Sequence, residues 1–276
     1  MNNPQENVSP YELIPEKEFK EHWPDSEGRK PGTLGRQYKV GQVCPLFSER
    51  MTVIPMREWS DIIDSPDYTG LWPAVPIVLD QDGVGSCASE SATGTVLTCR
   101  SFHGQEFTEL NPYYVYHTVS GGRDSGSGID ANLRFVRDHG IAPTSVWPRS
   151  KGFRATPSAE ANEAAKGFRI LEFYDITNAE EFGSALLQGF AVSYGRRGHS
   201  IYGIDVISTT KFRMQNSWGA WGDKGTAIES FSGVQWGYGA WAVRVSTNSG
   251  ESPFAKASEF TLPSPRLFEK CPIIAT

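Results

Sequence analysis

One cysteine, one histidine and one asparagine of this chain are placed so that they could perform nucleophilic chemistry together. Cys87 ends a glycine-rich turn that begins at Gln81, His199 lies far downstream, and Asn216 follows it. A thiol becomes a strong nucleophile when a base takes its proton, and that base needs a further group to orient it. The chain therefore supplies a thiol, an imidazole and an amide in an order that favours catalysis by an activated cysteine.

The element predicted around Cys87 favours the same chemistry. Cys87 opens a predicted helix that runs to about Arg100 and ends near Gly104. The first turn of a helix offers free N–H groups and the positive end of the helix dipole, which stabilise a thiolate. A nearby imidazolium adds to this effect, so we expect the pKa of the Cys87 thiol to lie well below its ordinary value of about 8.5.

The other predicted elements divide into a helical half and a strand half. Ile129, Leu133 and Val136 recur at helical spacing and stop at Gly140, which predicts a second amphipathic helix. The remaining predictions are helices at 156–167 and 178–188 and short strands at 168–174, 190–194, 201–207, 211–215 and 226–230. Helices followed by strands predict an α+β fold with two lobes and a cleft between them.

Composition excludes several classes of protein. The chain has 276 residues, 38% of them apolar, which is enough for one large core or two lobes. Its 26 basic and 32 acidic residues give a formal charge of -6, without the basic footprint of a nucleic-acid partner. No apolar run of about 20 residues could span a membrane, and no signal peptide is visible. We therefore expect a soluble cytoplasmic or intracellular protein with no nucleic-acid and no membrane partner.

The four cysteines indicate no metal site and no cofactor. Cys44, Cys87, Cys99 and Cys271 form no Cys-x-x-Cys pair, and no histidine lies nearby at ligand spacing. So few cysteines do not indicate a disulfide scaffold. Reduced thiols are expected, with a Cys44–Cys271 bridge and a Cys44–Cys87 disulfide as alternatives.

Proline content and polarity divide the chain into three parts. Residues 1–50 are polar and rich in proline, and are predicted to form an extended N-terminal arm that buries little. Residues 51–246 form the predicted globular domain, and residues 247–276 form a similar extended tail. Both ends are candidates for binding other protein subunits.

Residues 50–245 resemble the papain-like cysteine peptidases of the C1 type. Three blocks carry the resemblance: residues 81–92 around Cys87, residues 110–148, and residues 198–225 with the sequence Asn-Ser-Trp-Gly at 216–219. They occur in the order and at the spacing of a whole domain, and are more similar to short bacterial and viral members than to lysosomal cathepsins. The resemblance implies a papain-like two-lobe fold. The cysteine would lie on a helical N-terminal lobe, and the histidine and asparagine on a C-terminal lobe of antiparallel sheet or barrel.

The same resemblance implies a role for each of the spaced residues. Cys87 is the nucleophile, and His199 is the base that deprotonates it and later protonates the leaving amine. Asn216 orients the imidazole, while Gln81 and the backbone N–H of Cys87 donate to the oxyanion. Trp218 shields the hydrogen bond between His199 and Asn216 from water, which strengthens it.

Substrate binding is implied at a glycine-rich loop and beside the histidine. Gly126, Ser127 and Gly128 lie where the family pairs with the backbone of an extended peptide, and glycines permit such a close approach. Gly198 and Trp218 complete the predicted substrate-binding set.

Several features depart from the family pattern. Ala88 replaces the tryptophan that usually follows the nucleophile, so a more open wall beside the thiol is expected. Val84 stands where a common disulfide cysteine lies, which agrees with a reducing compartment. The segment after Asn216 is one residue shorter than usual. No helical pro-segment is recognisable in residues 1–50, although an extended arm could lie in the cleft.

Three functions are consistent with these observations. The first is a cysteine peptidase that hydrolyses peptide or protein substrates through an acyl-thioenzyme. The second is a papain-fold structural or docking component of a larger assembly such as a virus particle, in which case the protein would reside in the virion. The third is a thiol amidase that acts on cell-wall peptides.

Overall fold

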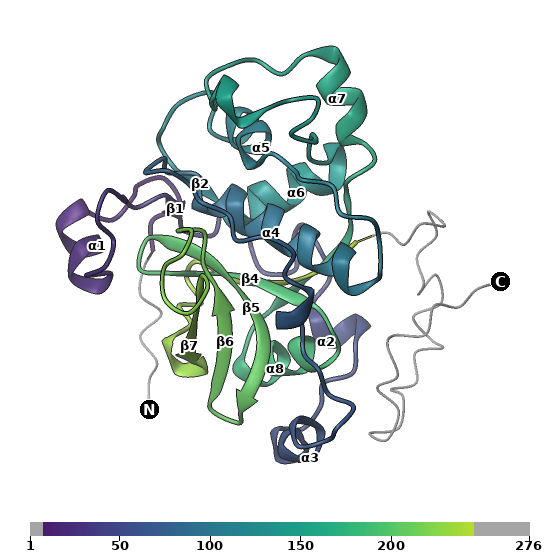
Figure 1. The fold of residues 1–276 in the computed structure, drawn as a ribbon. Helices are drawn as coiled ribbons and strands as arrows, with labels where there is room; N and C mark the ends of the chain where they lie inside the picture. Colours follow the sequence, from purple (N-terminus) through teal and green to yellow (C-terminus); the bar gives the residue numbers. More distant parts are fainter. Residues whose placement is uncertain (1–7, 246–276) are drawn as a thin grey trace.

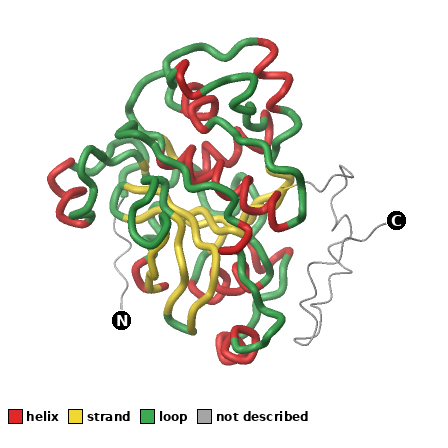
Figure 2. The backbone as a smooth tube through the Cα atoms, viewed as in Figure 1, coloured by secondary structure: helices red, strands yellow, loops and turns green. Residues whose placement is uncertain are grey.

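One half of the molecule is mainly helical, and the other half contains the large sheet together with shorter helices (Figures 1 and 2). The computed structural model describes residues 8–245. The helical half contains α4 (Cys87–Phe102), α5 (Pro112–Val119), α6 (Ile129–His139) and α7 (Ala159–Ala165). The other half is an antiparallel sheet in the order β3-β8-β4-β5-β6-β7, formed by β3 (Ile170–Ile176), β4 (Ala191–Arg196), β5 (His199–Ser208), β6 (Lys211–Gln215), β7 (Thr226–Ser230) and β8 (Ala240–Val245). The predicted α+β class is confirmed.

Shorter elements surround these two halves. The helices are α1 (Glu16–His22), α2 (Phe47–Arg50), α3 (Trp59–Ile63) and α8 (Ala179–Leu187), with single 3-10 turns η1 (Met56–Glu58), η2 (Trp72–Ala74), η3 (Arg149–Lys151) and η4 (Phe231–Gly233). A separate two-stranded parallel sheet joins β1 (Thr33–Leu34) to β2 (Ser127–Gly128).

Helix α6 forms where the sequence pattern predicts it. Ile129, Leu133 and Val136 are fully buried on its inner face. Gly140 ends the helix with φ 88° and ψ -166°, a backbone conformation that is almost confined to glycine. An added Cβ there would lie 1.9 Å from the carbonyl oxygen of Ala165, so the position also requires the absence of a side chain.

Several elements were not predicted from the sequence, and the most important of them are β8 and α5. Strand β8 lies between β3 and β4 in the middle of the sheet, and all six of its residues are buried. A strand that is buried on both faces lacks the alternation of apolar and polar residues that marks a half-exposed strand. Asn111 caps the start of helix α5, because its side chain accepts a hydrogen bond from the N–H of Tyr113. Pro112 is the first residue of the helix, a position where its missing N–H costs no hydrogen bond.

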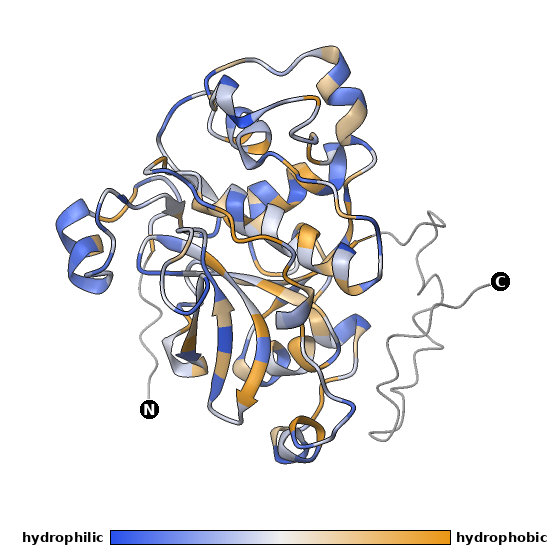
Figure 3. Ribbon diagram, in the orientation of Figure 1, coloured by the Kyte–Doolittle hydropathy of each residue, from blue (hydrophilic) through white to orange (hydrophobic). Residues whose placement is uncertain are grey.

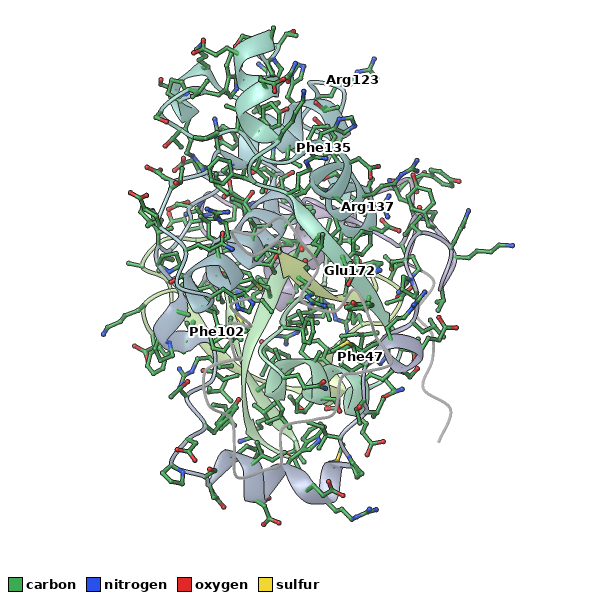
Figure 4. The ribbon with its side chains drawn as sticks, turned by 90° about the vertical axis from the view of Figure 1, so that its right-hand side faces the viewer. Phe47, Phe102, Arg123, Phe135, Arg137 and Glu172 are labelled. Carbon is green, nitrogen blue, oxygen red and sulfur yellow. The ribbon has the colours of Figure 1, made fainter. Side chains whose placement is uncertain are left out.

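Residues 8–245 form two hydrophobic cores, one on either side of the sheet. The first lies between α4, α6 and the sheet and includes Val96, Leu133 and Trp241. The second lies between α8, α2 and the opposite face and includes Phe47 and Phe182. Figure 3 shows apolar residues concentrated on the strands and a mostly polar α1. Figure 4 shows Phe135 of α6 in the upper part of the side view and Phe47 of α2 in the lower part.

The segment predicted as an N-terminal arm packs closely on the rest of the chain. Phe19 and Trp23 are buried, which differs from the expectation that so polar a segment buries little. Arg36 forms a bidentate ion pair with buried Asp175 of β3, with both distances 2.7 Å, and its guanidinium lies 4.5 Å from the ring centre of Trp241. The division into arm, domain and tail stays a prediction, and the tail, with Cys271, lies outside the described residues.

Two further features of residues 8–245 bear on function. None of the helices in this part of the chain has both the length and the apolarity needed to cross a bilayer. Within the same residues, no group of three or more His, Cys, Asp and Glu side chains is arranged to hold a metal ion.

We expect Gly140→Ala to destabilise the protein more than Gly152→Ala. Gly152 has a similar backbone conformation, φ 68° and ψ 169°, but an added Cβ there meets nothing within 4 Å. Both changes introduce backbone strain of about 1–3 kcal/mol, and only Gly140→Ala adds a clash with a backbone oxygen. Denaturant unfolding monitored by tryptophan fluorescence measures both losses. Equal losses for the two variants would contradict the role of close packing at Gly140.

Candidate active site

Close packing between α4 and β5 brings Cys87 to the beginning of the strand that carries His199. On this face α4 has small residues: Ser91 donates to the carbonyl of Ile201 at 3.0 Å, and a Cβ added at Gly94 would meet the Tyr202 ring at 2.5 Å. Cys87 is the first residue of α4, and its sulfur accepts from the backbone N–H groups of Ser200 and Ala88. The thiol therefore lies beside the residue that follows His199.

The His199 imidazole is held by an amide and an indole. Its Nε2 lies 2.7 Å from Oδ1 of Asn216, and its ring stacks on Trp218 with centroids 4.5 Å apart. The other nitrogen, Nδ1, is buried and has no hydrogen-bond partner among the described residues. Because Asn216 engages Nε2, the nitrogen that remains for the thiol is Nδ1.

Gln81 is fixed in one orientation by the residues that follow Asn216. Its Oε1 accepts from Ser217 Oγ at 3.1 Å and from Trp218 Nε1 at 3.0 Å. Two donors on this oxygen identify the other end of the amide as the NH2 group, which donates to the carbonyl of Val84 at 2.7 Å. The N–H of Ser217 also donates to Oδ1 of Asn216 at 2.7 Å, so Gln81, Asn216 and Trp218, which were predicted to act together, belong to one buried network.

Burial is the largest influence on the pKa values of the Cys87 thiol and the His199 imidazole. It raises the pKa of the Cys87 thiol to about 11, against the hydrogen bond from Thr33 and those from the backbone. It lowers the pKa of His199 to about 4, against the hydrogen bond to Asn216, and the charge of Arg29 lowers it further. At neutral pH the pair is therefore an uncharged thiol and imidazole. The expected low pKa of Cys87 is wrong for this form, because desolvation outweighs the helix terminus and no imidazolium is present.

Residues 8–35 cover this site, and sequence reasoning did not identify which of them reach it. Thr33 Oγ1 lies 3.0 Å from the Cys87 sulfur. Phe19 and Trp23 pack against His199 in T-shaped arrangements, with the Trp23 and His199 centroids 5.3 Å apart. The only sequence signal was the absence of a recognisable helical pro-segment, which left an extended cover as an expectation without naming its residues.

The predicted substrate-binding residues hold the backbone of this segment. The N–H of Ser127 donates to the carbonyl of Gly32 at 3.0 Å. The carbonyl of Gly198 accepts from the N–H groups of both Gly32 and Thr33, at 2.9 and 3.0 Å. Gly126 lies against Gly32, since a Cβ added at Gly126 would be 2.7 Å from the Gly32 oxygen, and Gly128 pairs with Leu34. An extended stretch of chain thus lies between the glycine-rich loop and Gly198.

The cysteines are reduced in the described part of the chain. Cys44, Cys87 and Cys99 are free and buried among the described residues, so the alternative of a Cys44–Cys87 disulfide is wrong. The alternative Cys44–Cys271 bridge involves a residue outside the described residues. Burial raises the pKa of Cys44 to about 12 and that of Cys99 to about 11.

Solved structures of other proteins share this architecture. Solved structures with the same arrangement include xylellain, a cysteine protease from Xylella fastidiosa, with a TM-score of 0.60 and 18% identity over 79% of this chain and 98% of that one. A digestive procathepsin L 3 of Tenebrio molitor has a TM-score of 0.54 and 16% identity over 83% and 88% of the two chains. The chain has a papain-like fold. The family resemblance inferred from the sequence is confirmed in this respect.

A sequence relative supports the same assignment. The cathepsin B-like protein CP3 of Giardia intestinalis is 25% identical over 200 residues, which cover 59% of this chain and 67% of that protein. No protein-family model matches the chain. The papain-like structure and this relative support the predicted cysteine-type peptidase, and none of the relatives named here is described as a component of a virus particle.

We expect Cys87 to react slowly with iodoacetamide at pH 7.5 in the intact chain. With a pKa of about 11, its thiolate fraction is on the order of 10² smaller than that of an ordinary cysteine thiol. Gly32→Ala should accelerate the reaction by about tenfold or more, because the new Cβ would lie 2.6 Å from the carbonyl oxygen of Gly85 and would exclude the covering segment. Mass spectrometry of tryptic peptides measures the labelling.

The labelling experiment has a control variant in the same segment and a result that would contradict the prediction. Gly28→Ala lies in the same segment, where an added Cβ meets nothing within 4 Å, and should change the rate far less. Labelling of Cys87 in the native chain as fast as in the urea-unfolded chain would show that the thiol is not covered.

Proposed function

We propose that this chain is a cysteine peptidase that hydrolyses peptide bonds through an acyl-thioenzyme, and that the structure is its latent form. The observation that carries the proposal is that an extended peptide segment already lies across the thiol. It is bound by backbone hydrogen bonds to Ser127 and Gly198, so the cleft accommodates peptide backbone. The likeness to cysteine proteases in fold and sequence supports the same chemistry.

The first half of the reaction forms the acyl-thioenzyme. His199 Nδ1 takes the proton of the Cys87 thiol, and the sulfur attacks the substrate carbonyl carbon. The carbon–oxygen double bond opens, and its electron pair moves to the oxygen. When the tetrahedral intermediate collapses, the imidazolium returns the proton to the leaving amine, and the carbon–nitrogen bond breaks.

Gln81 and the start of α4 stabilise the oxyanion. The NH2 group of Gln81 has a second N–H beside the one that donates to Val84, and the backbone N–H of Cys87 points from the first turn of the helix. Preorganised donors of this kind need no rearrangement as charge develops. Ser217 and Trp218 supply the preorganisation because they hold Oε1 and so fix which end of the amide faces the reaction.

The second half releases the acid product. Water attacks the thioester carbonyl while His199 accepts a proton from it. The tetrahedral intermediate then collapses, the carbon–sulfur bond breaks with its electron pair on sulfur, and the imidazolium returns the proton to that sulfur. Asn216 keeps the imidazole in one orientation through both halves, because Oδ1 continues to accept from Nε2–H. Trp218 covers this hydrogen bond and keeps water from competing for it.

We expect Gln81→Ala to lower kcat by about 10²–10³-fold with a much smaller change in KM, because it removes an oxyanion donor and leaves the thiol in place. The assay uses internally quenched peptides and the full chain carrying Gly32→Ala, so that the cleft is accessible. Gln42→Ala, at an exposed glutamine, is the matched control and should leave both constants unchanged.

Two results would count against the proposal. Retention of full kcat by Gln81→Ala would remove the assigned oxyanion role. Hydrolysis by a Cys87→Ala chain at the parental rate would remove the thiol mechanism itself.

A further inference from the structure

Two consecutive basic residues of the covering segment are bound by acidic residues of the cleft. Arg29 Nη1 lies 2.5 Å from Asp80 Oδ1, and Lys30 pairs with Asp124 Oδ2. Asp80 and Asp124 flank the turn that leads to Cys87 and the glycine-rich loop, respectively. The segment that occupies the cleft is therefore held by its side chains as well as by its backbone.

Asp124 is positioned by the rest of the domain without help from Lys30. Its Oδ1 accepts from the backbone N–H of Gly85 at 2.8 Å and from the hydroxyl of Tyr116 at 3.0 Å. Its side chain is 20% exposed, and Oδ2 faces Lys30. A carboxylate that is fixed by one oxygen and presents the other is preorganised to bind a cation.

Asp80 lies at the rim of the site, next to the indole that covers the histidine. It bridges to Trp218 in the backbone, and a Cβ added at Gly219 would lie 2.7 Å from Asp80 Oδ2. The N–H of Asp82 donates to Oδ1 at 2.9 Å. Arg149 donates to the backbone carbonyl of Asp80, but its side-chain ion pairs are with Asp82 and Glu90.

The covering segment supplies a cation to each of the two cleft carboxylates. When residues 29 and 30 leave, Asp124 loses its Lys30 partner and Asp80 loses the ion pair with Arg29, while the longer-range charge of Arg149 remains. We propose that Asp124, with Asp80 beside it, then forms a pair of subsites that selects peptide substrates carrying adjacent basic residues. This proposal rests on the proposed function, since it names the substrate class of the same cleft.

The test uses the full chain with Gly32→Ala and two internally quenched peptides that differ only at two adjacent positions. One peptide carries Arg-Lys and the other Gln-Gln. We expect kcat/KM to be about tenfold or more higher for the basic peptide at low ionic strength, since hydrogen bonds between charged partners are stronger than those between neutral ones. The preference should shrink in 1 M salt, because these carboxylates are partly exposed.

Substitutions in the two carboxylates identify the source of the preference. Asp124→Asn should reduce the ratio of the two kcat/KM values to near one for a peptide that is basic only at the lysine position. Asp80→Asn should do the same for a peptide that is basic only at the arginine position. Asp67→Asn, at an exposed site outside the cleft, is the matched control and should keep the full preference. An unchanged preference in both cleft variants would overturn the proposal.

A second measurement does not depend on hydrolysis. A synthetic peptide of residues 26–36 is added to the Gly32→Ala chain, and its protection of Cys87 from iodoacetamide is compared with that of the same peptide carrying Arg29→Gln and Lys30→Gln. We expect at least tenfold weaker protection by the substituted peptide, and the difference should disappear with Asp80→Asn and Asp124→Asn together. Equal protection by the two peptides would overturn the subsites. Selective protection without hydrolysis of any peptide would retain the subsites and overturn the peptidase function.

Discussion

The contact between the first half of α4 and the beginning of β5 is the constraint on which the site depends. A helix and a strand can approach this closely only where the facing side chains are small, and α4 presents Ser91 and Gly94 there. That approach places the Cys87 sulfur at the N–H of Ser200, the residue that follows His199. The orientation of the imidazole then follows from Asn216, whose position is set by the loop after β6. Larger residues on this face of α4 would separate the thiol from its base without touching either of them.

The same packing buries the site, and this burial determines the protonation states of Cys87 and His199. Cys87 and His199 are fully buried, so both groups prefer their uncharged forms. A helix terminus and a neighbouring base favour the thiolate, but only when solvent or a charged partner stabilises the ions. Coverage by Thr33, Phe19 and Trp23 therefore does more than obstruct the cleft. It also keeps the nucleophile in its unreactive protonation state.

Sequence patterns predicted the members of the candidate site and much of the fold, but not what covers the site. Gln81, Cys87, His199 and Asn216 could be named because their types and order carry the chemistry, and the structure brings Gln81 and Asn216 into one network. Strand β8 was missed because a fully buried strand has no alternating pattern. Thr33 and Gly32 could not be identified, since their importance arises from pairing with residues far along the chain, such as Ser127 and Gly198. Such a register depends on the fold, and no local propensity encodes it.

The ion pair between Arg36 and Asp175 gives the cover a property that a separate inhibitor would lack. It anchors the chain three residues beyond Thr33 to a buried strand of the sheet. The segment that fills the cleft is therefore an intramolecular ligand with a short tether, for which the effective concentration is on the order of millimolar. Dilution of the protein does not change that value, so closure is as complete in a single isolated molecule as in a concentrated solution. A peptide in solution has to compete with this local concentration before it reaches the thiol.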